Sequence, residues 1–170
     1  MTDGQTRGDA QSCAILRDLC NDLRGQICSA WRKGYRFTGS LHFGAMQPIA
    51  KRFPGIVDSD RGMMRVSLWG CSSVLLSPAG ADLLDSRSSR DENSLQTLHG
   101  LVGANVSTVE FDDIELTLEL VFSDEHRLLL SINSAQTSVD DEQWAVGRAN
   151  GCSAGVFGQR LIRTDCETPG

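Results

Sequence analysis

The stretch VEFDDIELTLELVFSDEHRLLLSI, residues 109–132, decides the fold class. Its apolar side chains fall on every second position, at Ile114, Leu116, Leu118, Leu120 and Phe122, and again at Leu128, Leu130 and Ile132. A period of two is that of a strand with one buried and one exposed face. The polar break SDEH, residues 123–126, separates the two runs, so the stretch predicts an antiparallel hairpin.

Similar patterns recur on both sides of this hairpin. Apolar residues recur every three or four positions over residues 10–23 and again over 95–102, which predicts two amphipathic helices. Shorter alternating runs predict strands near residues 27–32, 37–43, 63–69, 74–76, 106–111, 144 and 156–162. The connection between Gly44 and Gly62 contains Pro48 and Pro54 and is typical of a long working loop.

Short motifs suggest that the chain repeats itself. Leu23-Arg24-Gly25 matches Leu101-Val102-Gly103, and Thr38, Leu41 and Phe43 match Thr117, Leu120 and Phe122 at the same spacing. Trp69 lies near the place that Trp144 has in the second copy. We therefore expect an α+β fold: a mainly antiparallel sheet, fused or packed from two weakly similar helix-strand-strand-strand units, with two helices packed on it. The 170 residues are expected to form a single domain, with repeats over residues 10–84 and 91–163 joined by a polar linker, 85–94.

Charge separates the two halves of the chain. Residues 1–90 contain 12 Lys and Arg and 8 Asp and Glu, whereas residues 91–170 contain 4 and 14, which together give the net charge of −6. An acidic surface repels phosphate and attracts basic proteins, so we expect a basic protein partner and no direct nucleic-acid partner. The alternative is a solvated acidic face that serves solubility alone.

Residues that often carry out catalysis do not form a known motif. The three histidines, His42, His99 and His126, and the six cysteines lack the spacing of a metal site, so no metal, cofactor or catalytic residue is predicted. The N-terminus resembles no export signal and no apolar run is long enough to span a membrane, so we expect a cytoplasmic protein, not membrane-bound, with free thiols.

The motifs L-x-G, T-x-x-L-x-F and Trp over residues 23–147 resemble those of small bacterial proteins, some of which accompany polymorphic toxins. In size, acidity and lack of active-site motifs the chain also resembles the immunity proteins of contact-dependent growth inhibition systems. The resemblance implies stoichiometric binding of a cognate toxin domain, which the acidity of this chain predicts to be basic, for example a nuclease.

Acidic residues of the second half form the predicted partner-binding set, with Trp144 beside them as a candidate apolar anchor. The set is Glu115, Glu119, Asp124, Glu125, Asp140, Asp141, Glu142 and Trp144. A monomer or small oligomer is expected. Two alternatives stay open: a small cytoplasmic enzyme that uses Cys71 with His42, because such partners need only meet in space, and a structural or adaptor domain with no catalytic role.

Overall fold

The computed structural model of the chain describes residues 10–48, 60–87, 91–133, 142–149 and 151–163. These residues form two helices and eleven strands. The helices are α1 (Ala10–Leu23) and the 3₁₀ helix η1 (Glu92–Leu101). The strands are β1 (Cys28–Lys33), β2 (Thr38–Pro48), β3 (Asp60–Trp69), β4 (Ser72–Leu76), β5 (Asp82–Asp85), β6 (Val106–Asp112), β7 (Thr117–Phe122), β8 (Arg127–Ser131), β9 (Glu142–Arg148), β10 (Ser153–Phe157) and β11 (Arg160–Arg163).

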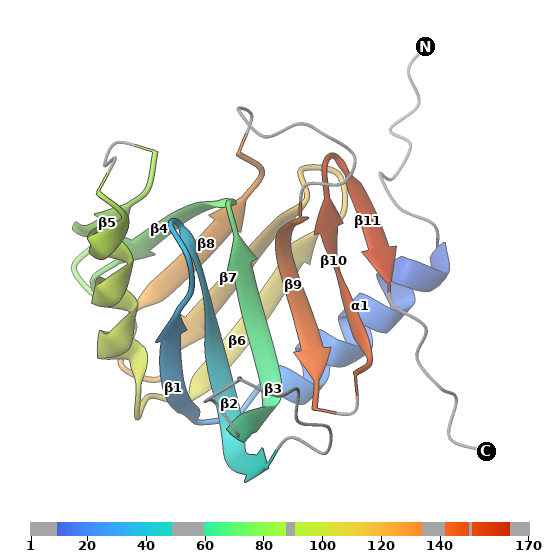
Figure 1. Cartoon of the computed structure of the whole chain (residues 1–170), viewed down its shortest axis with the longest axis horizontal. Helices are drawn as coiled ribbons and strands as arrows, with labels where there is room; N and C mark the ends of the chain where they lie inside the picture. The colour runs from blue at the N-terminus through green and yellow to red at the C-terminus, as the bar shows by residue number, and fades with distance from the viewer. Residues whose placement is uncertain (1–9, 49–59, 88–90, 134–141, 150, 164–170) are drawn as a thin grey trace.

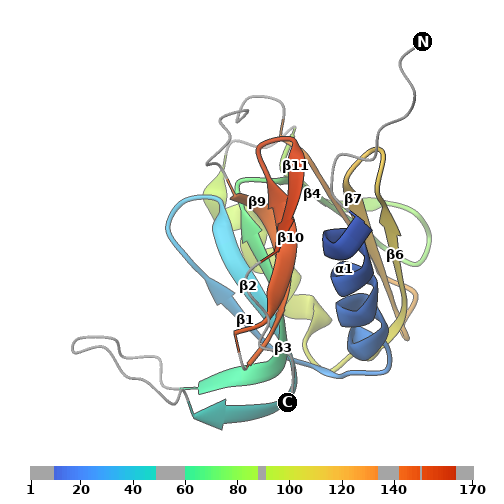
Figure 2. The ribbon, with the colours of Figure 1, turned by 90° about the vertical axis from the view of Figure 1, so that its right-hand side faces the viewer.

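The strands form two antiparallel sheets that face each other across one hydrophobic core (Figures 1 and 2). Sheet 1 has the order β1-β2-β3-β9-β10-β11, and sheet 2 has the order β5-β4-β8-β7-β6. The predicted α+β class with mainly antiparallel strands is confirmed. The prediction did not specify two separate layers, because alternation identifies the buried face of a strand but not its neighbours.

The chain changes sheets twice. The order helix, strand, strand, strand occurs as α1, β1, β2, β3 and again as η1, β6, β7, β8. After each of these units the chain crosses to the opposite layer: β4 pairs with β8 of sheet 2, and β9 pairs with β3 of sheet 1. Each sheet is therefore built from both halves of the sequence.

The two helices lie at opposite margins of the sandwich. The helix α1 contacts β6 of sheet 2 and β9, β10 and β11 of sheet 1, and Figure 2 shows it between the two layers. The helix η1 contacts β1 and β5 at the other margin. Its buried residues Leu95, Leu98 and Leu101 recur strictly every three positions, which matches the three residues per turn of a 3₁₀ helix.

Three local predictions differ from the structure. The predicted strand at Ile114 is a turn, because Asp112 Oδ1 accepts hydrogen bonds from the backbone N–H groups of Ile114 and Glu115, and β7 begins only at Thr117. The single strand predicted over 156–162 is the hairpin of β10 and β11, with Gly158 at φ 58° between them. The strand β5 was not predicted.

The expected loop from Gly44 to Gly62 is shorter than predicted at both ends, because β2 continues to Pro48 and β3 begins at Asp60. Residues 49–59 lie outside the described part.

Candidate functional site

Charge is segregated between the two sheets. The strands of sheet 1 contain seven basic residues, Arg32, Lys33, Arg61, Arg65, Arg148, Arg160 and Arg163, against the two acids Asp60 and Glu142. The strands of sheet 2 contain five acids, Asp82, Asp85, Glu110, Asp112 and Glu119, against the single base Arg127. The molecule therefore has a basic layer and an acidic layer.

The exchange of strands sharpens this segregation. The strands β9 to β11 come from the acidic half of the sequence, yet they add three arginines and one glutamate to the basic sheet. The strand β5 comes from the basic half and adds two aspartates to the acidic sheet. Charge counted along the sequence could not show this, because it depends on which strands pair.

The acidic side chains of sheet 2 concentrate on β6, β7 and the turns at both ends of β7. We call this region the acidic hairpin surface; it consists of Glu110, Asp112, Asp113, Glu115, Glu119, Asp124 and Glu125. Glu110, Glu115 and Glu125 are exposed, and among the described residues they have no Lys or Arg in an ion pair. This surface is the candidate functional site.

Two glutamates lie directly opposite each other at its centre. Glu110 of β6 pairs in register with Glu119 of β7. Like charges at such positions destabilise a sheet. Arg127 of β8 relieves part of this repulsion, because its Nε and Nη2 atoms donate to Glu119 Oε1 at 3.0 and 2.6 Å. Glu110 has no such partner among the described residues, so negative charge remains at the centre of the surface.

Two hydrogen bonds stabilise the turn between β6 and β7. The backbone N–H groups of Glu115 and Ile114 donate to Asp112 Oδ1 at 3.0 and 2.9 Å, and these two bonds lower the pKa of the Asp112 carboxyl. Asp112 therefore stays ionised at lower pH than an ordinary aspartate does. Asp113, next to it, lies 3.6 Å from Arg17 of α1. A surface that is ordered before binding loses less entropy when a partner docks.

The predicted partner-binding residues do not all come together. Glu115, Glu119, Asp124 and Glu125 belong to the acidic hairpin surface, with Glu115 at one end of β7 and the Asp124-Glu125 pair at the other. Glu142 begins β9 and lies on sheet 1. Asp140 and Asp141 lie outside the described residues.

The hypothesis that Trp144 anchors a partner is wrong. Its side chain is 0% exposed. Its Nε1–H donates to the carbonyl of Leu116 at 3.1 Å, and its ring meets the ring of Phe111 edge to face, with 5.9 Å between centroids. Trp144 comes from sheet 1 and both partners come from the β6–β7 hairpin, so it joins the two layers of the core.

The predicted set omitted three members of the surface, Glu110, Asp112 and Asp113. A sequence signal for Glu110 was available, because residues 106–111 were predicted as a strand entering the hairpin and Glu110 is its exposed charged residue. The pairing of Glu110 with Glu119 depends on the register between β6 and β7. The sequence did not show this register, because β7 begins at Thr117 and not at Ile114 as predicted.

The alternative enzyme site, Cys71 with His42, is not assembled. Cys71 is buried just after β3, and burial raises the pKa of its thiol to about 12. Trp69, two residues before Cys71, pairs with Thr38 of β2. His42 lies four residues further along β2, so about 13 Å separates it from Thr38 at the rise of a strand. A thiol this far from a base and this resistant to ionisation is not an activated nucleophile.

His42 and Ser40 do form a contact, but its geometry is that of a structural pair. His42 is 4% exposed, and its Nδ1 accepts the backbone N–H of Gly62 at 3.1 Å. The proton of the neutral ring is therefore on Nε2, which lies 3.0 Å from Ser40 Oγ and donates to it. His42 consequently cannot take a proton from Ser40 in this arrangement.

Replacing His42 should test this structural role. We expect His42→Phe to lower the free energy of unfolding by about 1–3 kcal/mol, because the buried N–H of Gly62 loses its acceptor. Urea unfolding followed by circular dichroism measures the change. His42→Asn, which can still offer an acceptor, serves as the milder comparison, and equal stability of His42→Phe and the wild type would contradict the assignment.

The cysteines are only partly as predicted. Cys13, Cys20, Cys28 and Cys71 are buried free thiols, but Cys152 is disulfide-bonded, so the prediction of free thiols is wrong for Cys152. The pKa values of Cys20 and Cys28 are also raised to about 12, again mainly by burial.

We expect iodoacetamide to label none of the four free thiols readily in the folded protein and all four after unfolding without reductant, as mass spectrometry would show. Rapid labelling of Cys71 in the folded state would contradict its burial.

Glu142 should make stability depend on pH. Burial raises the pKa of its carboxyl, and the positive charge of Arg65 opposes only part of this effect. As pH rises above the unfolded-state pKa of about 4.3, the unfolded chain releases its proton first, so the folded state loses relative stability. We expect Glu142→Gln to raise the melting temperature slightly at pH 7 and to leave it unchanged near pH 3. Asp82→Asn on β5 is the matched control, and a gain that persists at pH 3 would contradict the assignment.

The described residues lack two other kinds of functional feature. No three of their His, Cys, Asp or Glu side chains gather as a metal site requires, and neither helix is long and apolar enough to cross a bilayer. Searches of protein families, of characterised proteins and of solved structures find no match to this chain.

Proposed function

We propose that this chain is an immunity-type protein that binds and neutralises a cognate basic toxin domain, such as a nuclease, through the acidic hairpin surface. The observation that carries the proposal is the concentration of seven carboxylates on one hairpin and its turns, with Glu110 and Glu119 directly opposite each other. Natural sheets avoid facing like charges unless something offsets the cost. A basic partner offsets it.

The position of the acids suits a surface that covers another protein. Glu119 lies in β7 and Glu110 faces it from β6, while the other five acids lie at or beyond the two ends of β7. The acids are therefore spread over the length of the hairpin and can meet an extended basic surface. Such complementarity accelerates association, and it also fixes the orientation in which the partner docks. In a nuclease the basic surface is the path of the nucleic acid, so covering it blocks the substrate.

The proposed setting is the cytoplasm, where the protein would meet the toxin as a monomer or small oligomer. The four buried free cysteines are compatible with a reducing compartment, where thiols stay reduced. The disulfide at Cys152 is unusual for that compartment. Fractionation of the cells that produce the protein would locate it, and recovery outside the cytoplasm would overturn this part of the proposal.

The decisive experiment begins with the neighbouring gene. Immunity genes commonly follow the gene of their toxin, so the C-terminal domain encoded by a large gene just upstream would be co-expressed with this protein. We expect a stable complex on size exclusion and restored growth of cells that express the toxin domain. If no such gene precedes this one, or the two purified proteins do not associate, the proposal fails.

A further inference from the structure

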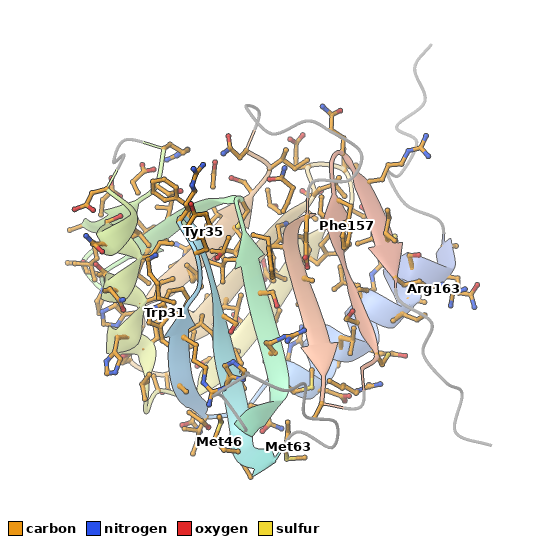
Figure 3. All side chains as sticks on the ribbon, viewed as in Figure 1. Trp31, Tyr35, Met46, Met63, Phe157 and Arg163 are labelled. Carbon is orange, nitrogen blue, oxygen red and sulfur yellow. The ribbon has the colours of Figure 1, made fainter. Side chains whose placement is uncertain are left out.

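A row of exposed aromatic side chains crosses one end of sheet 1. Trp69, at the end of β3, is 53% exposed, and Tyr35, in the turn between β1 and β2, is 77% exposed. Phe157, at the end of β10, is partly exposed. Figure 3 shows Tyr35 and Phe157 toward one end of the sheet, with Met46 and Met63 at the other.

The strand register places these rings at one level. Leu68 and Val156 both pair with Trp144 of β9, from either side. Trp69 and Phe157 each follow by one residue, so they point away from the core that holds Leu68 and Val156. They are separated by the width of two strand spacings, about 10 Å. Trp69 also pairs with Thr38 of β2, and the hydroxyl of Thr38 donates to the carbonyl of Tyr35 in the turn between β1 and β2.

Side-chain hydrogen bonds stabilise the exposed turn that presents Tyr35. Lys33 Nζ donates to the carbonyls of Gly34 and Arg36 at 3.1 and 2.6 Å. Thr38 Oγ1 donates to the carbonyl of Tyr35 at 2.6 Å. The guanidinium of Arg36 lies over the Tyr35 ring, 5.3 Å from its centroid. These bonds fix the backbone beneath an exposed ring, and a fixed ring binds a flat ligand at a lower entropic cost.

Positive charge accompanies the aromatic row. Lys33 and Arg36 lie in or beside the Tyr35 turn, and Arg160 of β11 pairs in register with Phe157. The acidic hairpin surface belongs to the other sheet. From the acidic half of the sequence, the strands bring Arg160 and one acid, Glu142 of β9, to this end of sheet 1, and both pair in register with Phe157. The repulsion of phosphate here is therefore much smaller than the charge of that whole half suggests.

We propose that this end of sheet 1 binds single-stranded nucleic acid, with bases stacked on Tyr35, Trp69 and Phe157 and phosphates beside Lys33, Arg36 and Arg160. Aromatic side chains on an exposed antiparallel sheet, flanked by cations, are a common platform for unpaired bases. Duplexes fit poorly, because their bases are already stacked. The site is separate from the proposed toxin interface. The proposal departs from the expectation of no nucleic-acid partner, because that expectation rested on charge summed over each half of the chain.

The test is fluorescence anisotropy with a labelled oligothymidylate of about 12 nucleotides, a length within the range that one such platform occupies. We expect binding by the wild type, and about tenfold weaker binding by Trp69→Ala and by Tyr35→Ala, because each removes one stacking partner. Arg36→Gln should reduce the slope of log affinity against log salt by about one. Ile114→Ala is the matched control, since this side chain is 54% exposed in the turn between β6 and β7 of the other sheet, and it should bind like the wild type.

Several results would overturn the proposal. These are no binding by the wild type at low salt, equal affinity for a duplex of the same length, or unchanged affinity in both aromatic variants. Polyglutamate is a further control for an acidic protein ligand. Displacement of the oligonucleotide by polyglutamate at the same charge concentration would show a surface that recognises negative charge alone, whereas resistance to it supports stacking of bases. Circular dichroism of each variant confirms that the fold is retained.

Discussion

Trp144→Ala should lower the free energy of unfolding by about 3–5 kcal/mol, the usual cost of removing a fully buried aromatic ring. The side chain is fully buried between the sheets, where it contacts Phe111 of β6 and donates to the carbonyl of Leu116. Its removal would leave a cavity and an unpaired buried carbonyl. It would also loosen the β6–β7 turn, because Leu116 has φ 56°, a backbone conformation that leucine adopts only when its surroundings hold it there.

Two further variants separate the hydrogen bond of Trp144 from the packing of its ring. Trp144→Phe keeps much of the ring but loses the donor, so we expect an intermediate loss of about 1–3 kcal/mol from the unpaired Leu116 carbonyl. Trp69→Ala changes an exposed tryptophan and should alter stability by about 0.5 kcal/mol or less. Guanidinium unfolding followed by far-ultraviolet circular dichroism compares them. If Trp144→Ala costs no more than Trp69→Ala, the packing of Trp144 between the layers is wrong.

The elements that the sequence predicted well are those whose signal is local. The helix α1 was predicted over residues 10–23, the range it occupies, because its buried face repeats along a single helix and Gly25 follows it at φ 80°. The strands β6 and β8 were predicted within a residue or two for the same reason: alternation reports which face of a strand is buried.

The features of the fold that could not be predicted from the sequence depend on strand partners that are distant along the chain. Nothing in residues 142–148 shows that β9 leaves the hairpin β7–β8 and pairs with β3, some eighty residues earlier. That pairing creates the two layers and removes three arginines from the acidic sheet. It also buries Trp144, whose neighbours in sequence are acidic and suggested a surface position. The candidate site was therefore predicted in part: its turns were visible as acidic breaks, but its centre, Glu110 opposite Glu119, required the register.

Under the proposed function, reversing charge on the acidic hairpin surface should slow the capture of a basic toxin domain. We expect the double change Glu115→Lys and Glu125→Lys to lower the association rate constant by about tenfold or more at low salt, because the electrostatic attraction that steers basic proteins to this surface is weakened. Both side chains are exposed and lie at opposite ends of β7, so the fold should tolerate the change. Glu119 is unsuitable for this test, since Arg127 would lose its partner.

The dissociation rate constant should change much less than the association rate constant, because contacts at an exposed rim steer encounter more than they hold the complex. Surface plasmon resonance against the co-expressed toxin domain measures both constants. The matched control is Asp82→Lys on β5, three strands from β7 in the same sheet, and it should leave the association rate near the wild-type value. The difference between the variants should shrink as salt is raised, because screening shortens the reach of the charges. Equal association rates for the double variant and the wild type at low salt would show that the partner binds elsewhere on the molecule.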